Sequence, residues 1–314
     1  METESFFQRM KDGTEISVNR WIPDGNKPVK GIIQLSHGMA EHAMRYDRFG
    51  CILAENGYIL NAHDFRGHGR TAQRAVQNGT GKFGILADQN GFSKIVDDLD
   101  EVILKVKKDF PGKRLILFGH SFGSFVAQAY IENYASQICG CILCGTAGPR
   151  PGFIAIGKCV ADCVCAFRGR MHYSEILRKF SFSSYCNRIS DVVNGQEWLS
   201  RDSDSVKIYL NDAWCGFLPS AGFYQDMTGG LKMIHKVKNM KKIPENLPLF
   251  VICGSDDPVG GYTKSVKKLV RCYSKYGIKS VILKIYPGAR HELLNETNRD
   301  EVISDILLWI DKTI

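Results

Sequence analysis

The most informative stretch of the chain is residues 114–134, RLILFGHSFGSFVAQAYIENY. It begins with an apolar run, Arg114 to Phe118, that is typical of a buried strand, and it continues as a helical segment, Ser121 to Tyr134. Between the two, Gly119-His120-Ser121-Phe122-Gly123 has the form G-x-S-x-G. Glycine on both sides permits a sharp turn that holds the serine hydroxyl outward. The stretch therefore predicts a reactive serine, Ser121; the alternative is a serine that only caps a helix.

Outward from this stretch, apolar runs alternate with helical segments, which is the pattern of a mostly parallel sheet with helices on both faces. Further buried strands are expected at residues 31–36, 58–61, 140–144, 249–254 and 280–286, and further helices at 92–110, 263–275 and 300–313. Lys11-Asp12-Gly13 is a turn signal, so residues 5–10 and 14–21 are expected to form a hairpin. The sequence thus predicts an α/β fold.

The segment from about residue 146 to 245 breaks this alternation. It is rich in aromatic residues and glycine, and it is helical wherever it has a period. We interpret it as a helical cap inserted above the sheet rather than as an independent domain. The expected organisation is a first core part (1–145), a cap (146–245) and a second core part (246–314).

The composition is that of an ordinary globular protein, with 44% hydrophobic and 24% charged residues among 314. No run approaches the roughly 18 apolar residues of a membrane-spanning helix. Residues 1–20 lack a basic region followed by an apolar one, so no secretion signal is expected. The eleven cysteines do not form paired CxxC motifs. Free thiols in a cytoplasmic protein are the expectation.

The net charge of +8 is spread along most of the chain, so no nucleic-acid partner is expected. A local excess of basic residues lies between residues 145 and 190. This segment contains two acidic residues, Asp162 and Glu175, and seven basic ones: Arg150, Lys158, Arg168, Arg170, Arg178, Lys179 and Arg188. This excess is compatible with peripheral contact with an anionic membrane surface. The alternative is a solvated face, which is the usual role of such residues.

A serine hydroxyl needs a base within hydrogen-bond reach and an acid that orients the base. In folds with this serine turn, the acid and then the histidine follow the serine in chain order, each after a strand. Asp257 follows the strand at 249–254, and His291 follows the strand at 280–286. His291 is the only histidine C-terminal to that acid. Asp257 is preferred as the acid, and its neighbour Asp256 stays open as an alternative.

Acyl transfer also needs two backbone N–H groups directed at the developing oxyanion. One is expected from Phe122, the residue after the serine. The other is expected from Met39, in the loop His37-Gly38-Met39-Ala40-Glu41-His42 that follows the strand at 31–36. The alternative for this loop is a simple glycine turn.

Five segments together resemble the monoacylglycerol lipase and lysophospholipase branch of the α/β-hydrolases, a serine aminopeptidase S33-type group. They are residues 37–42 with Arg45-Tyr46, 64–69 (DFRGHG), 119–123, 254–257 (GSDD) and 288–292 (GARHE). The resemblance implies an α/β-hydrolase fold, a triad of Ser121, Asp257 and His291, and oxyanion donors at Met39 and Phe122. It also implies a mobile cap over an acyl-chain pocket, loops braced by Glu41, Arg45 and residues 64–69, and no metal or organic cofactor.

The expected activity is hydrolysis of a carboxylic ester of a lipid-like substrate, monoacylglycerol or lysophospholipid, through an acyl-enzyme. Apolar residues recur at helical spacing in the expected cap: Phe153, Ile154, Ile156, Val160, Val164 and Phe167, with Cys163 on the same side. This face either packs against the core or lines the pocket entrance. In the second case the nearby basic residues would favour lysophospholipid. The sequence does not define the oligomeric state.

Three alternatives come from other classes of protein. Gly79-Thr80-Gly81-Lys82-Phe83-Gly84 fits G-x-G-x-x-G, but no buried strand precedes it, so a dinucleotide site lacks its context. A peptidase on the same fold, such as a proline iminopeptidase, needs a polar group to hold a substrate amine, and none can be assigned in the cap. A binding protein that kept the scaffold is disfavoured by the complete set of catalytic residue types.

Overall fold

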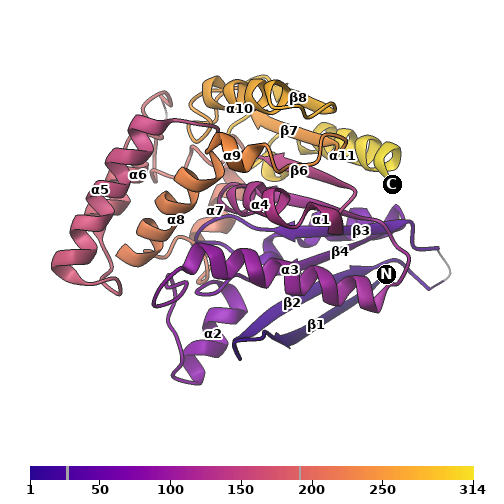
Figure 1. The fold of residues 1–314 in the computed structure, drawn as a ribbon, viewed down its shortest axis with the longest axis horizontal. Helices are drawn as coiled ribbons and strands as arrows, with labels where there is room; N and C mark the ends of the chain where they lie inside the picture. The colour runs from indigo at the N-terminus through magenta and orange to yellow at the C-terminus, as the bar shows by residue number, and fades with distance from the viewer. Residues whose placement is uncertain (26–27, 191) are drawn as a thin grey trace.

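A computed structural model describes residues 1–25, 28–190 and 192–314 and contains an eight-stranded sheet (Figure 1). The spatial order is β1-β2-β4-β3-β5-β6-β7-β8, and every pair from β4 to β8 is parallel, while β1 and β2 are antiparallel to their neighbours. The expected mostly parallel sheet is confirmed. The strands are β1 Glu2–Arg9, β2 Glu15–Ile22, β3 Gly31–Ser36, β4 Tyr58–His63, β5 Leu115–His120, β6 Gly140–Cys144, β7 Leu249–Gly254 and β8 Val281–Tyr286.

Helices cover both faces of the sheet because side chains alternate along each buried strand. Ile116 and Phe118 of β5 pack in one apolar cluster with α1 (Asp47–Glu55) and α11 (Arg299–Thr313). Leu115 and Leu117 point to the other face, which α3 (Gly91–Asp109), α4 (Phe122–Asn133) and α10 (Lys264–Lys275) cover. The remaining short elements of the core are η1 Ala43–Tyr46, α2 Gly69–Gln77, η2 Ala135–Gln137 and η3 Leu293–Asn295.

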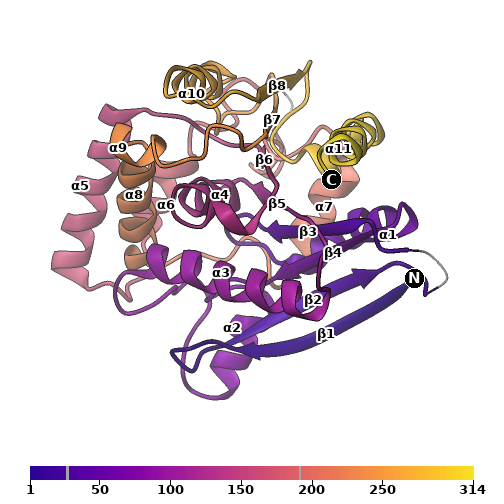
Figure 2. The same cartoon turned by 45° about the vertical axis from the view of Figure 1, so that its right-hand side comes forward.

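Five helices lie between β6 and β7 in the chain. They are α5 Pro151–Arg168, α6 Glu175–Phe182, α7 Ser203–Asn211, α8 Ala221–Ile234 and α9 Val237–Met240. Helices α5, α6, α8 and α9 stand together to the left of the strands in Figure 2, whereas α7 lies apart from them, behind the core strands. Helices α5 and α8 pack side by side, and α8 also contacts α3 and α4 of the core. The boundaries expected at residues 145/146 and 245/246 fall between β6 and α5 and between α9 and β7.

The apolar face expected on the first cap helix does not act as one surface. Ile154 is buried, and Val160 and Val164 pack half-buried beside Ala161, whereas Phe153, Ile156 and Phe167 are 50%, 57% and 86% exposed. The expectation that the whole face packs against the core is therefore wrong. The reason is that α5 contacts α8 and α6 along one narrow side, while apolar residues continue around the helix.

Among the described residues, no helix combines the length and the apolar character needed to cross a bilayer.

Candidate active site

Ser121 lies in the turn between β5 and α4, and its backbone is outside the helical region, with φ of 51°. Both flanking glycines are required by close packing. A Cβ on Gly119 would lie 2.7 Å from the Gly123 carbonyl oxygen, and a Cβ on Gly123 would lie 2.0 Å from the Ser36 carbonyl oxygen. Helix α4 starts at Phe122 rather than at the expected Ser121. Ser121 therefore lies in the turn before the helix, in a strained backbone conformation.

The three residues singled out from the sequence converge although they are far apart in the chain. Nε2 of His291 lies 2.8 Å from Oγ of Ser121, and Nδ1 of His291 lies 3.0 Å from Oδ1 of Asp257. The same Asp257 oxygen accepts a hydrogen bond of 2.8 Å from the Val259 N–H. Asp257 is fully buried, whereas Asp256 is exposed and accepts a hydrogen bond from the Ser255 hydroxyl instead. The structure thus places Asp257, and not Asp256, beside His291.

The imidazole of His291 is buried between the rings of Trp198 and His120, with centroid distances of 5.1 and 5.0 Å. Burial alone would lower the pKa of His291, but the Asp257 carboxylate outweighs it and raises the pKa above 6.5. His120 has no such partner, so burial and the neighbouring His291 lower the pKa of His120 to about 4. His291 therefore binds a proton more readily than His120 does.

The loop carrying Met39 packs directly against the serine turn. A Cβ on Gly38 would lie 3.3 Å from Cβ of Ser121, and Met39 and Phe122 both line the cavity above Ser121. The loop is held in shape by Glu41, whose Oε1 accepts hydrogen bonds from the Gly38 N–H and from the Tyr46 hydroxyl. The structure therefore brings both expected donor residues to the same side of Ser121.

An ion cluster joins this loop to the loop of His291. The Arg45 guanidinium donates two hydrogen bonds to Glu292, at 2.7 and 2.8 Å, and a third to Glu41 at 2.5 Å. All three side chains are buried. Burial favours the neutral acid, but Arg45 reverses this and lowers the pKa of Glu292. Because Glu292 follows His291 directly, the cluster ties the loop that carries Met39 to the loop that carries His291.

A second set of hydrogen bonds holds the loop that carries Met39. Asp64, which opens the 64–69 segment, accepts hydrogen bonds of 2.8 Å from the backbone N–H groups of Ala43 and Arg70. Nε2 of His37 accepts a bond of 3.1 Å from the Phe65 N–H. These residues lie behind the loop, on the side away from the cavity, so they position it without reaching a substrate.

The cavity above Ser121 has a polar end and a long apolar part. Glu41, His120 and Glu292 contribute polar groups close to the serine. The apolar part runs between the core and the cap, and it is lined by Phe125, Ile154, Leu177, Tyr224, Met227 and Leu231. Such a cavity suits a ligand with a polar group at the reacting end and a hydrocarbon chain beyond it.

Two cavity residues escaped the sequence analysis. Trp198 covers His291, and the backbone of the Trp198–Leu199 segment accepts hydrogen bonds from His291 and Glu292. His235, just after α8, lines the cavity with both ring nitrogens buried and without a hydrogen-bond partner. Burial lowers the pKa of His235 to about 4. Neither residue lies in a motif, so no sequence signal identifies it.

The glycine motif at residues 79–84 has no role in this site. It follows helix α2 rather than a strand, so it lacks the strand-to-helix turn that a dinucleotide site requires.

Comparisons with known proteins identify the family of this chain. Residues 27–298 match the family described as serine aminopeptidase, S33. The monoacylglycerol lipase of Mycolicibacterium smegmatis is 28% identical over 310 residues, which cover 95% of this chain and 93% of that protein. Human monoglyceride lipase is 26% identical over 309 residues, covering 96% of this chain and 88% of that protein.

The fold has a close solved counterpart. A thermostable carboxyl esterase of Bacillus coagulans superposes with a TM-score of 0.86 at 27% identity, covering 100% of this chain and 99% of that one. The expected α/β-hydrolase fold and carboxylic-ester hydrolase class are confirmed by these likenesses. The chain belongs to the serine aminopeptidase S33 family of α/β-hydrolases.

Proposed function

We propose that the chain hydrolyses a carboxylic ester of a lipid-like substrate through an acyl-enzyme, with Ser121 as nucleophile, His291 as base and Asp257 as the orienting acid. The observation that carries the proposal is the contact of 2.8 Å between Ser121 Oγ and His291 Nε2, with the buried Asp257 carboxylate 3.0 Å from Nδ1 of the same imidazole. A nucleophile, a base and an oriented acid in this order provide what acyl transfer requires.

The reaction follows from this arrangement. As Ser121 Oγ attacks the ester carbonyl, His291 accepts its proton, and the N–H groups of Met39 and Phe122 stabilise the oxyanion. His291 then donates the proton to the departing alcohol. A water molecule, deprotonated by His291, attacks the acyl-enzyme and releases the acid. The charge of Asp257 stabilises the imidazolium that forms in both steps.

The cavity favours an acyl chain on the cap side and a hydroxylated alcohol on the polar side. Leu177, Met227 and Leu231 offer apolar walls to the chain, while Glu41 and Glu292 place two carboxylates at the polar end of the cavity. Arg45 pairs with both of these carboxylates, so the three groups together carry one net negative charge, which disfavours a phosphate at the polar end. Monoacylglycerol is therefore our first substrate. Two curated relatives of this chain, those of Mycolicibacterium smegmatis and human, are named for this activity, which supports it.

Lysophospholipid is the second candidate, since Arg150 and Arg178 also line the cavity. A head group placed toward these arginines rather than toward Glu41 and Glu292 would gain favourable charge interactions.

We further propose that the cap contacts an anionic lipid surface. Ile156 and Phe167 of α5 and Ile176 of α6 are exposed apolar residues, with 57%, 86% and 68% of their surface accessible. Two basic residues lie on the same helices, Arg168 in the last turn of α5 and Lys179 in the last turn of α6. Apolar groups bordered by cations are the combination that binds an anionic interface.

The proposed reaction is tested with purified chain and a panel of monoacylglycerols, lysophospholipids, p-nitrophenyl esters and aminoacyl amides. We expect ester cleavage to exceed amide cleavage, and Ser121→Ala to lower the rate by roughly 10⁶. Ser304→Ala is the matched control, because Ser304 is an exposed serine of α11 that does not line the cavity. Preference for aminoacyl amides would indicate a peptidase, and near-normal turnover by Ser121→Ala would contradict the mechanism.

A further inference from the structure

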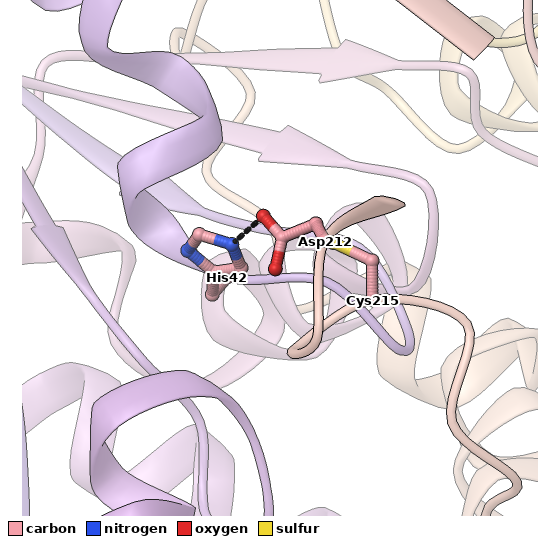
Figure 3. A group of neighbouring side chains, drawn as sticks. All are labelled: His42, Asp212 and Cys215. Carbon is pink, nitrogen blue, oxygen red and sulfur yellow. Dashed lines mark hydrogen bonds and ion pairs between the residues drawn. The ribbon is translucent and has the colours of Figure 1, made fainter. Parts of the chain in front are cut away.

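Three side chains with metal-binding atoms meet outside the proposed catalytic centre (Figure 3). His42 follows the oxyanion loop, and Asp212 and Cys215 lie on the cap loop between α7 and α8. One ligand atom from each residue lies within 4.8 Å of the other two. In the described part of the chain, no other group of three or more His, Cys, Asp or Glu side chains comes together in this way.

The local backbone holds these groups in place. Oδ1 of Asp212 accepts the Trp214 N–H at 2.8 Å, and the Cys215 N–H donates to the Asp212 carbonyl at 3.0 Å. This turn puts the carboxylate and the thiol on one side of the loop. Oδ2 of Asp212 is left to face Nε2 of His42, at 2.7 Å, and the His42 ring rests edge-on against Trp214 with centroids 5.2 Å apart.

The surrounding charge favours a cation. Charged neighbours that act on Cys215 include Arg45, which is positive, and Glu41, Asp212 and Glu292, which are negative. His42 is almost fully buried, while the Asp212 side chain is 26% exposed, so an ion could enter from the cap side. A hard cation such as Mg²⁺ prefers oxygen ligands, whereas one sulfur, one imidazole and one carboxylate suit Zn²⁺.

We propose that His42, Asp212 and Cys215 bind a zinc ion, with water as the fourth ligand, and that the ion fastens the cap to the oxyanion loop. In a tetrahedral zinc site the nitrogen and oxygen ligands stand roughly 3.3 Å apart, so the His42–Asp212 contact opens by about 0.6 Å. The thiol loses its proton to solvent as the zinc–sulfur bond forms.

The ion would strengthen a junction that already exists. The Gly216 N–H and the Tyr209 hydroxyl, from the same cap region, both donate to the Ala40 carbonyl, at 2.9 and 3.3 Å. Ala40 is the residue after Met39. A zinc ion at His42 would therefore add a bond between the two segments next to one of the proposed oxyanion donors, and its role would be structural.

The test uses the full chain after treatment with a chelator. Co²⁺ is titrated first, because a cobalt–thiolate bond gives a charge-transfer absorption band, and Zn²⁺ is then added to displace it. We expect one metal per chain, and a melting temperature that rises with Zn²⁺ concentration. Cys215→Ser should remove the band, and Asp212→Asn should weaken binding by at least about tenfold.

The matched control is the double variant Cys159→Ser/Cys163→Ser, which removes the two exposed thiols one helical turn apart on α5. It should keep both the band and the stabilisation. Each variant is first checked for a cooperative melting transition without metal, so that lost binding is not confused with lost folding. A band that persists in Cys215→Ser, a band lost in the control, or no band in the native chain would each overturn the proposal.

Discussion

Ser121 and His291 show how the surroundings of a residue determine its chemistry. The serine is held in a strained backbone conformation at the end of β5, and its base is enclosed by Trp198 and His120. Because Asp257 raises the pKa of His291 above 6.5, the proposed base is ready to retain a proton once it has accepted one.

The pH dependence of the rate tests this environment. The base must be neutral to act, so kcat/KM should fall at low pH along a single ionisation with a midpoint above pH 6.5, the ordinary value for histidine. The pKa of His120 is about 4, so that ring stays neutral and does not produce this midpoint. A pH–rate profile of a soluble ester measures it, and a midpoint below 6.5 would contradict the assigned interaction with Asp257.

The two adjacent acids are separated by a pair of variants. Asp257→Asn should lower kcat by roughly 10⁴, because the amide cannot stabilise the imidazolium. Asp256→Asn should leave kcat near that of the native chain, because Asp256 is exposed and contacts Ser255. Steady-state kinetics on one ester compare the kcat of the two variants with that of the native chain. Equal losses in both variants, or a larger loss in Asp256→Asn, would reverse the assignment.

The sequence could name Ser121 and His291 because motif and chain order single them out. It favoured Asp257 but left Asp256 open, since the two are neighbours on one turn. The choice depends on which side chain turns inward, and a backbone contact with Val259, invisible in the sequence, holds Asp257 in that position.

At the scale of elements, the site is assembled from loops that connect strands of the core with segments of the cap. The Arg45 cluster links the oxyanion loop to the loop of His291, and residues 198–199 of the cap bind the latter through backbone hydrogen bonds. The helical spacing of apolar residues 153–167 predicted the helix observed as α5, whereas the bounds of α6 to α9 were not predicted. Which side of α5 faces outward was not predictable, because apolar residues occur on both its packed and its exposed sides.

The outward side of α5 gives a prediction about lipid surfaces. Ile156→Ser/Phe167→Ser should reduce sedimentation with anionic vesicles by roughly tenfold, because two exposed apolar anchors are lost. Hydrolysis of a soluble p-nitrophenyl ester should be unchanged, since neither residue lines the cavity. Leu308→Ser, at a residue of α11 that is 55% exposed, is the control and should bind vesicles normally. Equal vesicle binding by all three proteins would refute the contact.

At the scale of the whole molecule, the two apolar layers on the sheet hold the strand ends in register, and this rigidity lets distant residues meet. The parallel order of the central strands was predictable from alternating apolar runs. The extent of β1, Glu2–Arg9 rather than 5–10, was not, because backbone pairing with β2 extends this edge strand into polar residues.

The core also contains a destabilising group. Glu132 of α4 is 5% exposed, and burial raises its pKa from 4.5 to about 9, with Lys242 offsetting only part of the effect. Between these two pH values the folded chain holds a proton that the unfolded chain has lost, so stability falls as pH rises. Glu132→Gln should remove this loss and add about 1–3 kcal/mol at pH 8, with little gain near pH 4.5.

Thermal unfolding of the two proteins across this pH range measures the difference. Glu245→Gln, at an exposed ion pair with Lys279, is the control and should show no pH-dependent gain. A gain for Glu132→Gln that is the same at both ends of the range would show that the carboxyl group is not buried in its neutral form.

The central claim, that His291 and Asp257, both distant in the chain, make Ser121 nucleophilic, is tested most directly by fluorophosphonate labelling followed by peptide mass spectrometry. We predict one adduct, on Ser121, with no labelling of Ser121→Ala and much slower labelling of His291→Ala. A folded native chain that hydrolyses esters but carries its adduct on another residue, or carries none, would contradict the account.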